Sequence, residues 1–319
     1  MPRNIILIGI LLGAAVACSK PNELPPGQGP SVVPPSPGPP TIDATIAFES
    51  TRDGPQAIYV ATEDGAQVRR LTFGTRPAWS PDAREIAFTQ YDHCVRCGIQ
   101  VMNADGSGFR FIAEGADPTW SPDGTKIAFR ALRHQAQILV MNRDGSGVTL
   151  LARDDDPNYY LGDARWLPDG RITYVRSTYG LEAATMSAVR PDGSGPEMID
   201  FDARCNPNDF AWSPDGTSAA CGRFYDGLFL ASLPGRGFNM LVGGDRSLDA
   251  VLFNPAWSPD GREIAFSRYD GTTGCQYPNC QKRLYAAAVS GGAVRRLIPD
   301  ATSTFSIYHD DHVAWSRRR

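Results

Sequence analysis

The sequence predicts an all-β protein whose main domain is a six-bladed β-propeller with four antiparallel strands in each blade. Three observations predict this fold. One tryptophan motif recurs six times, short apolar runs follow it in a constant order, and the first and last repeats are each incomplete. A repeat of about 40–45 residues with four strands is the period of a propeller blade. We therefore expect residues 44–319 to form a ring.

The tryptophans mark the first strand of each repeat. Four are followed by Ser-Pro-Asp and one by Leu-Pro-Asp-Gly, sequences that favour tight turns. One tryptophan at the same place in every blade indicates packing between adjacent blades, and not stacking on a ligand. The six are Trp79, Trp120, Trp166, Trp212, Trp257 and Trp315.

Three further apolar runs predict the other strands. The second strand reads Ile-Ala-Phe at 86–88, 127–129 and 264–266, the third reads IQVMN at 99–103, and the fourth reads VRRLT at 68–72. Asp-Gly turns separate these short β-branched or aromatic runs, as in β-hairpins. We find no convincing helical stripe in the chain.

The two ends of the ring are expected to complete one blade. The first repeat begins at its second strand, residues 46–48, and lacks a tryptophan strand. The chain ends with a tryptophan strand, residues 312–316, that has no followers. The Trp315 strand should therefore join the N-terminal blade, which leaves no open sheet edge in the ring.

The repeats resemble those of the PD40, or TolB-like, propeller family over residues 44–316. The shared markers are W-S-P-D-G, I-A-F, I-Y-V/M-N and R-R-L-T. The resemblance implies the repeat type but is weak on function. TolB itself has an α/β domain where this chain has a proline-rich segment. Similar repeats occur in the propellers of prolyl-oligopeptidase-like enzymes and in some pectin-degrading lyases.

Residues 1–18 are typical of a secretory signal, with Arg3 before an apolar core that is too short to span a bilayer. Cys18 follows Ala15-Val16-Ala17, which resembles the lipobox of bacterial lipoproteins with Ala15 in place of the usual leucine. This implies lipid attachment at Cys18; an ordinary cleaved signal is the alternative. Ser19 resembles the sorting residue of an outer-membrane lipoprotein, facing the periplasm or the cell surface.

Residues 19–43 are rich in proline, glycine and serine and predict a disordered linker between the anchor and the ring. The formal net charge of the chain is −4, and no basic stripe is present. Nucleic acid is therefore not an expected partner. We expect a monomer that is tethered to a membrane.

No sequence motif identifies a catalytic residue, a metal site or a cofactor. Nucleophile-elbow, zinc-protease, phosphate-loop and dinucleotide patterns are all absent from the sequence. Asp154, Asp155 and Asp156 with Asp163 are a minor alternative as a divalent-cation site. We predict no catalytic residue, metal or cofactor.

Candidate binding residues lie in the long connections between strands. The Ser-Pro-Asp-Gly and Asp-Gly-Ser-Gly turns should share one face of the ring, which we call the uniform face. The long, irregular loops should share the opposite, variable-loop face, where function usually resides. Its candidate residues are His93, His134, His309, Asp310, Asp311 and His312, the last four in a loop before the Trp315 strand.

Six cysteines remain after Cys18, an even number that favours disulfides in an exported protein. We predict the local pairs Cys94–Cys97, Cys205–Cys221 and Cys275–Cys280, one set among 15 possible pairings. Metal binding and redox chemistry are the alternatives.

The predicted function is that of a membrane-tethered scaffold which binds a protein or a cell-envelope component through the variable-loop face. The alternative is an enzyme, a polysaccharide lyase or a hydrolase, with an axial active site. The two differ in one observable. An enzyme should bring His, Asp, Arg or Glu from several blades within about 5 Å of one another at the variable end of the channel.

Overall fold

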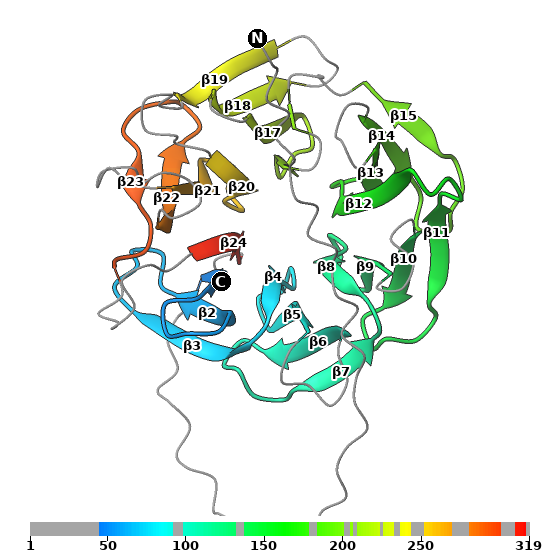
Figure 1. Cartoon of the computed structure of the whole chain (residues 1–319), viewed down its shortest axis with the longest axis horizontal. Coiled ribbons are helices and arrows are strands. Elements are labelled where there is room, and N and C mark those ends of the chain that lie inside the picture. Colours follow the sequence, from blue (N-terminus) through cyan, green and yellow to red (C-terminus); the bar gives the residue numbers. More distant parts are fainter. Residues whose placement is uncertain are drawn as a thin grey trace, which may run out of the picture. The chain divides into compact units, whose positions relative to one another are not determined.

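The computed structural model describes residues 45–91, 98–131, 137–178, 184–200, 205–206, 209–223, 226–232, 237–243, 252–269, 281–300 and 310–316. The chain divides into two units, Met1–Pro40 and Thr41–Arg319. The second unit is a ring of six four-stranded antiparallel sheets (Figure 1). No helix of the described part is long and apolar enough to cross a membrane.

The strands of each blade are given from the channel outward. Blade 1 has β24 (Asp310–Trp315), β1 (Ile46–Ser50), β2 (Ala57–Ala61) and β3 (Val68–Phe73). Blade 2 has β4 (Thr75–Trp79), β5 (Glu85–Gln90), β6 (Gly98–Asn103) and β7 (Arg110–Ala113). Blade 3 has β8 (Ala116–Trp120), β9 (Lys126–Arg130), β10 (Gln137–Asn142) and β11 (Thr149–Arg153). Blade 4 has β12 (Tyr159–Trp166), β13 (Ile172–Thr178), β14 (Ala184–Val189) and β15 (Glu197–Ile199). Blade 5 has β16 (Phe210–Trp212), β17 (Ser218–Arg223), β18 (Gly227–Ser232) and β19 (Gly237–Gly243). Blade 6 has β20 (Leu252–Trp257), β21 (Glu263–Tyr269), β22 (Lys282–Ala288) and β23 (Arg295–Arg296).

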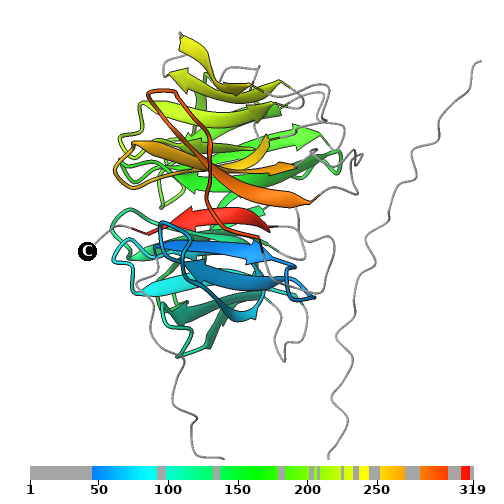
Figure 2. The same ribbon diagram turned by 90° about the vertical axis from the view of Figure 1, so that its left-hand side faces the viewer.

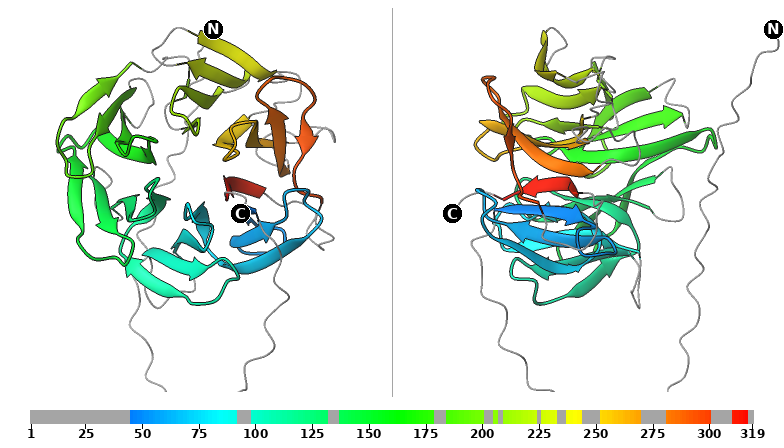
Figure 3. Two further views of the ribbon diagram at one scale, coloured as in Figure 1. Left: turned by 180° about the vertical axis from the view of Figure 1, so that it is seen from behind. Right: turned by 60° about the vertical axis from the view of Figure 1, so that its left-hand side comes forward.

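The predicted closure of the ring is confirmed. Strand β24 lies against β1 in the N-terminal blade, red beside blue in Figure 2. Ile46 is paired with Trp315 across the two strands, and the backbone N–H of Ser316 donates to the carbonyl of Thr45 at 2.7 Å. The view from behind in Figure 3 shows β24 completing the blue blade at the inner edge of the ring.

The core lies within and between the blades, where the Ile-Ala-Phe strands are fully buried. Blade 5 departs from this pattern. The third residue of its second-strand motif is Cys221, whereas the other five blades have an aromatic residue there. Phe210 on the neighbouring strand is paired with Cys221, and its side chain is 1% exposed. The aromatic ring has thus moved to the adjacent strand of the same blade, where it packs into the same cluster as Cys221.

Two strands begin earlier than the sequence indicated. Asp310 and Asp311 were expected in a loop, but both belong to β24, where they are paired with Ser50 and Glu49 of β1. Similarly, β12 begins at Tyr159, although its repeat predicts a long loop of the variable-loop face over residues 153–164. In both cases backbone pairing with the second strand of the blade extends the first strand beyond its apolar run.

The turns of the uniform face share one hydrogen-bonding pattern. In three of them the serine hydroxyl after the tryptophan donates to the aspartate two residues later at 2.6 Å. Hydrogen bonds from Ser121 and from the Thr125 backbone hold the pKa of Asp123 below its ordinary value. Four of these turns place a glycine at positive φ, whereas blade 2 places Ala83 there with a φ of 57°.

Candidate functional site: the axial channel

The innermost strands of the six blades surround an axial channel with a cavity volume of about 420 Å³. Side chains alternate along each of these strands. On β8, for example, Asp117 and Thr119 are half-buried, whereas Pro118 and Trp120 are buried. The residues one and three positions before the tryptophan therefore provide the polar groups at the channel wall.

The position three residues before each tryptophan is polar in every blade, and we call these six positions the polar ring. The innermost strands lead directly into the turns of the uniform face, so the polar ring lies toward the variable-loop end of the channel. Five of its side chains line the cavity: Arg76, Asp117, Asp209, Asn254 and His312. The sixth position, on β12, is Asp163.

The backbone is strained at the polar ring. Four of its non-glycine residues have a left-handed backbone, with φ of 54° at Arg76, 56° at Asp117, 52° at Asn254 and 42° at His312. Each lies at a register shift against the neighbouring strand, which defines a β-bulge. A left-handed non-glycine residue costs about 1–2 kcal/mol. Strain that recurs at one level of a channel is a reason to look for function there.

Glu49 of β1 is the hub of this level. Its side chain is buried and accepts hydrogen bonds from the backbone N–H of Arg76 at 2.7 Å and from Nε2 of Gln56 at 2.8 Å. Its Oε1 atom also lies 2.6 Å from Nδ1 of His312. One carboxylate therefore connects β24, β1 and the first strand of blade 2. It also fixes the orientation of the His312 imidazole.

Asp117 is held by two arginines. Its Oδ2 atom accepts from Nε and Nη2 of Arg130, both at 2.9 Å, and its Oδ1 lies 3.5 Å from Nε of Arg76. Burial alone would raise the pKa of Asp117, but the positive charges of Arg76 and Arg130 outweigh it and hold the pKa below its ordinary value. Asp117 is therefore a carboxylate at neutral pH.

The bulged N–H groups find acceptors in the preceding blade. Glu49 accepts from Arg76, and the hydroxyl of Thr89 accepts from the N–H of Asp117 at 3.0 Å. Blade 5 carries Gly222 at the corresponding place on its second strand. There, Asp209 of the polar ring accepts from the N–H of Asn254 at 2.6 Å. These acceptors offset the cost of exposing a backbone N–H at these three bulges.

The residue just before each tryptophan forms a second level, which we call the inner layer. It consists of Ala78, Thr119, Arg165, Ala211, Ala256 and Ala314, all of which line the cavity. Five of the six are small. Arg165 of blade 4 is the single charged member.

The structure brings together only part of the predicted binding residues. His312 belongs to the polar ring. Asp310 and Asp311 lie on β24 and are described through their backbone pairing. The others fall outside the described residues, as does the lipid-attachment cysteine: Cys18, His93, Cys94, Cys97, His134, Cys275, Cys280 and His309.

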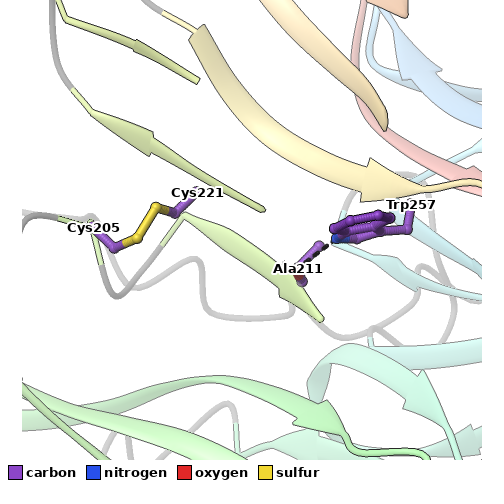
Figure 4. The surroundings of a disulfide bond; sticks show 4 residues. All are labelled: Cys205, Ala211, Cys221 and Trp257. Carbon is purple, nitrogen blue, oxygen red and sulfur yellow. Dashed lines mark hydrogen bonds between the residues drawn. A yellow bond between two sulfur atoms is a disulfide. The ribbon is translucent and has the colours of Figure 1, made fainter. Parts of the chain in front are cut away.

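The predicted Cys205–Cys221 disulfide is present, with its two Cα atoms 5.5 Å apart. It joins the segment before β16 to β17, within one blade (Figure 4). Both cysteines are buried among apolar side chains that include Trp212. The disulfide braces the entry of the chain into blade 5, and its position gives it no direct part in the polar ring.

Sequence reasoning missed most of the polar ring. Arg76, Asp117, Asp209 and Asn254 were not predicted, and neither was Arg165 of the inner layer. Superposing the six repeats on their tryptophans would have revealed them, because the third residue before the tryptophan is polar in every repeat.

Two aspartates of the alternative cation site form ion pairs with arginines. Asp154 contacts Arg176, and Asp155 contacts Arg153. Among the residues that the structure describes, no group of three or more His, Cys, Asp or Glu side chains could hold a metal ion.

These features define a six-bladed β-propeller with a polar axial channel, and comparison with known proteins identifies its fold as TolB-like. TolB from Acinetobacter baumannii has a TM-score of 0.64 and 18% identity, over 86% of this chain and 67% of that one. A chain of the nidogen/laminin complex has a TM-score of 0.61 and 11% identity, over 86% and 100%. An oligogalacturonate lyase from Vibrio parahaemolyticus has a TM-score of 0.50 and 14% identity, over 73% and 72%.

These likenesses concern the fold, because all three identities are below 20%. No family model matches the sequence, and no curated protein matches it.

Proposed function

We propose that the protein is a binding scaffold that takes a segment of a partner protein at the variable-loop end of its axial channel. The polar ring carries this proposal. Five blades each contribute a polar residue that lines the cavity at the same level of the channel, and four of them do so through a strained bulge. A cavity of about 420 Å³ suits a few extended residues and not a folded domain.

The partner class follows from the walls of the channel. Saccharide sites usually present exposed aromatic faces, whereas none of the six channel tryptophans is exposed: Trp79, Trp120 and Trp212 are only 6–8% exposed, and the other three are partly buried. The polar ring and the inner layer instead offer hydrogen-bonding groups such as Asn254 and Thr119, which suit peptide groups. A protein segment is therefore favoured over another cell-envelope component.

We also propose that the ring is tethered to the outer membrane by a lipid on Cys18, facing the periplasm or the surface. The signal-like residues 1–18 and the proline-rich residues 19–43 support this arrangement. Replacing Cys18 with Ser should release the protein from the membrane fraction of its native host. Unchanged partition of the Cys18→Ser variant would contradict the anchor.

Site-specific photocrosslinking tests the binding site. A photoreactive amino acid at Ala256 of the inner layer should yield protein adducts in the native envelope, and Arg76→Ala should abolish them. The control places the same group at Thr125, an exposed residue of a uniform-face turn. Adducts that survive Arg76→Ala, or that form equally from Thr125, would overturn the proposal.

A second candidate, an enzyme with an axial active site, is favoured by one specific observation. His312 and Glu49 lie 2.6 Å apart, and the Arg76 side chain lies 3.5 Å from Asp117, so ionisable groups of three blades meet at one level. A carboxylate-oriented imidazole is the arrangement of a general base. His312→Ala should abolish turnover of a polysaccharide or peptide substrate if this candidate holds. Turnover that is unaffected by His312→Ala would exclude it.

A further inference from the structure

Blade 5 holds its member of the polar ring without a long first strand. Strand β16 has only three residues, Phe210–Trp212, whereas the first strands of the other blades have five to eight. In those five blades the polar-ring residue lies within the first strand, but Asp209 comes just before β16. Asp209 also lacks the left-handed backbone that four other members of the polar ring share. Another feature of blade 5 therefore sets its position.

The position of Asp209 matters for the next blade. Its Oδ1 atom accepts the backbone N–H of Asn254 at 2.6 Å, and its side chain is 7% exposed. At the two preceding joints the acceptor is a second-strand side chain, Glu49 or Thr89. Blade 5 has Gly222 at that place, which offers no side chain. A shift of Asp209 would therefore break the bond that supports the bulge at Asn254.

The Cys205–Cys221 disulfide lies beside the bonds that hold Asp209 (Figure 4). The N–H of Asn206 donates to the carbonyl of Gly222 at 3.2 Å, and the N–H of Asp209 donates to the carbonyl of Asn206 at 3.0 Å. The N–H of Gly222 in turn donates to the carbonyl of Asp209 at 3.0 Å. Asn206 and Gly222 each directly follow a cysteine of the disulfide. The covalent link therefore keeps these backbone partners opposite each other where strand pairing is missing.

We propose that the Cys205–Cys221 disulfide is a positioning group for the binding site, so that the polar ring is complete only in the oxidised protein. To form it, the two thiols give two electrons and two protons to a disulfide oxidant, which leaves as a dithiol. In a reducing compartment Asp209 is held by hydrogen bonds alone. A site that is only partly formed binds its ligand more weakly in proportion.

The effect on a partner rests on the proposed function, because it needs a ligand in the channel. The positioning of Asp209 does not, and it can be measured on the protein alone. Together they imply that the protein gains its full affinity for a protein segment after it reaches an oxidising compartment.

Hydrogen–deuterium exchange of the Asn254 amide tests the positioning role on the full chain. The double variant Cys205→Ala/Cys221→Ala removes the link and leaves no free thiol. The Asn254 amide should exchange at least about tenfold faster, the effect of losing one hydrogen bond to a charged acceptor. The amides of Arg76 and Asp117 have acceptors in blades 1 and 2 and should keep their wild-type rates. Unchanged exchange at Asn254, or equal acceleration of all three amides, would overturn the proposal.

A second comparison shows whether the disulfide acts through Asp209. In the oxidised protein Asp209→Ala should accelerate the Asn254 amide by a similar factor, and in the double cysteine variant it should add little, because groups that act as one unit are not additive. Fully additive effects would overturn the proposal. Thr217→Ala, in the exposed uniform-face turn of the same blade, is the matched control and should leave Asn254 exchange unchanged.

Reduction of the folded wild type gives the same test if the double variant does not fold. After treatment with dithiothreitol and alkylation of the thiols, the Asn254 amide should again exchange at least about tenfold faster, while Arg76 and Asp117 keep their rates. Complete reduction of the disulfide without a change at Asn254 would overturn the proposal.

Crosslinking from Ala256 connects the disulfide to the partner. The photoreactive protein should lose most of its adducts when it also carries Cys205→Ala/Cys221→Ala, and equal yields would overturn the oxidation-dependent binding. The two proposals fail separately. Absent adducts in both proteins would reject the binding scaffold, whereas Asn254 exchange that ignores the disulfide would reject the positioning role alone.

Discussion

The joints on the two sides of β24 differ from the other joints between blades. In four joints an indole N–H bonds across to the preceding blade: Trp120 to Ala78, Trp166 to Thr119, Trp257 to Ala211 (Figure 4), and Trp212 to the hydroxyl of Thr173. The Nε1 atoms of Trp79 and Trp315 are buried and have no partner among the described residues. Trp79 lies on β4, in the blade that follows β24 around the ring, and Trp315 lies on β24 itself.

The missing indole hydrogen bonds show the cost of closing the ring with a strand from the far end of the chain. Three of the four bonds end on the carbonyl just before the tryptophan of the preceding blade. By that pattern, Trp79 would need the carbonyl of Ala314, and Trp315 would need that of Ala256. Both missing bonds involve β24. The closing strand satisfies the sheet edge through β1 but leaves a buried N–H at each joint, at about 1–3 kcal/mol apiece.

We call the two joints beside β24 the seam. Glu49 should stabilise the seam more than any other residue does, because it joins β24 to the first strand of blade 2. Glu49→Ala removes the acceptor of the Arg76 N–H and the partner of His312, and should lower the free energy of unfolding by about 3 kcal/mol. Thr89→Ala is the matched change at the next joint, where only the N–H of Asp117 loses its acceptor. Its cost should be about 1 kcal/mol. Equal costs in urea denaturation would show that the seam needs no special support.

Tryptophan replacement compares the joints directly. Trp120→Phe breaks a formed hydrogen bond, whereas Trp79→Phe removes a buried N–H that has no partner. Both lose similar apolar volume, so Trp79→Phe should be less destabilising by about 1–2 kcal/mol. The measurement is the urea midpoint of each variant at constant m-value. An equal loss in Trp79→Phe and Trp120→Phe would mean that Trp79 is hydrogen-bonded like the other tryptophans in solution.

The joint between blades 2 and 3 should weaken in acid. Arg76 and Arg130 hold the pKa of Asp117 below its unfolded value of about 3.9. Its contribution to stability is therefore complete above the unfolded pKa and is lost as the pH falls through the lower folded pKa. Asp117→Asn should lower stability at pH 7 and narrow the gap to the wild type below about pH 3. Thermal melts of both proteins from pH 7 to pH 2 check this, and a gap that stays constant would contradict it.

The same joints show how far sequence reasoning reaches. The repeated sequence motifs around the tryptophans predicted the blades, the closure by the Trp315 strand and the inter-blade packing. They could do so because the same residues have the same surroundings in every blade. The polar ring has no repeated sequence motif. Arg76, Asp117 and His312 share a position but not a chemistry, and their level in the channel depends on a bulge that apolar periodicity does not reveal. The aromatic residue of blade 5 was also missed, because Phe210 lies on the first strand of the blade and not on the second, where the other repeats carry it.

The smallest expected effect concerns the uniform-face turn of blade 2, beside the seam. Ala83 adopts a φ of 57° where the turns of blades 3 to 6 have glycine. The left-handed conformation costs an alanine about 1 kcal/mol, and part of the gain from glycine is lost to its greater freedom in the unfolded chain. Ala83→Gly should therefore raise the free energy of unfolding by about 0.5 kcal/mol. Gly124→Ala, the reverse change in blade 3, should lower it by about 1 kcal/mol. If Ala83→Gly destabilised the ring, Ala83 would not be strained in solution. The missing tryptophan hydrogen bonds would then be the one difference between the seam and the other joints.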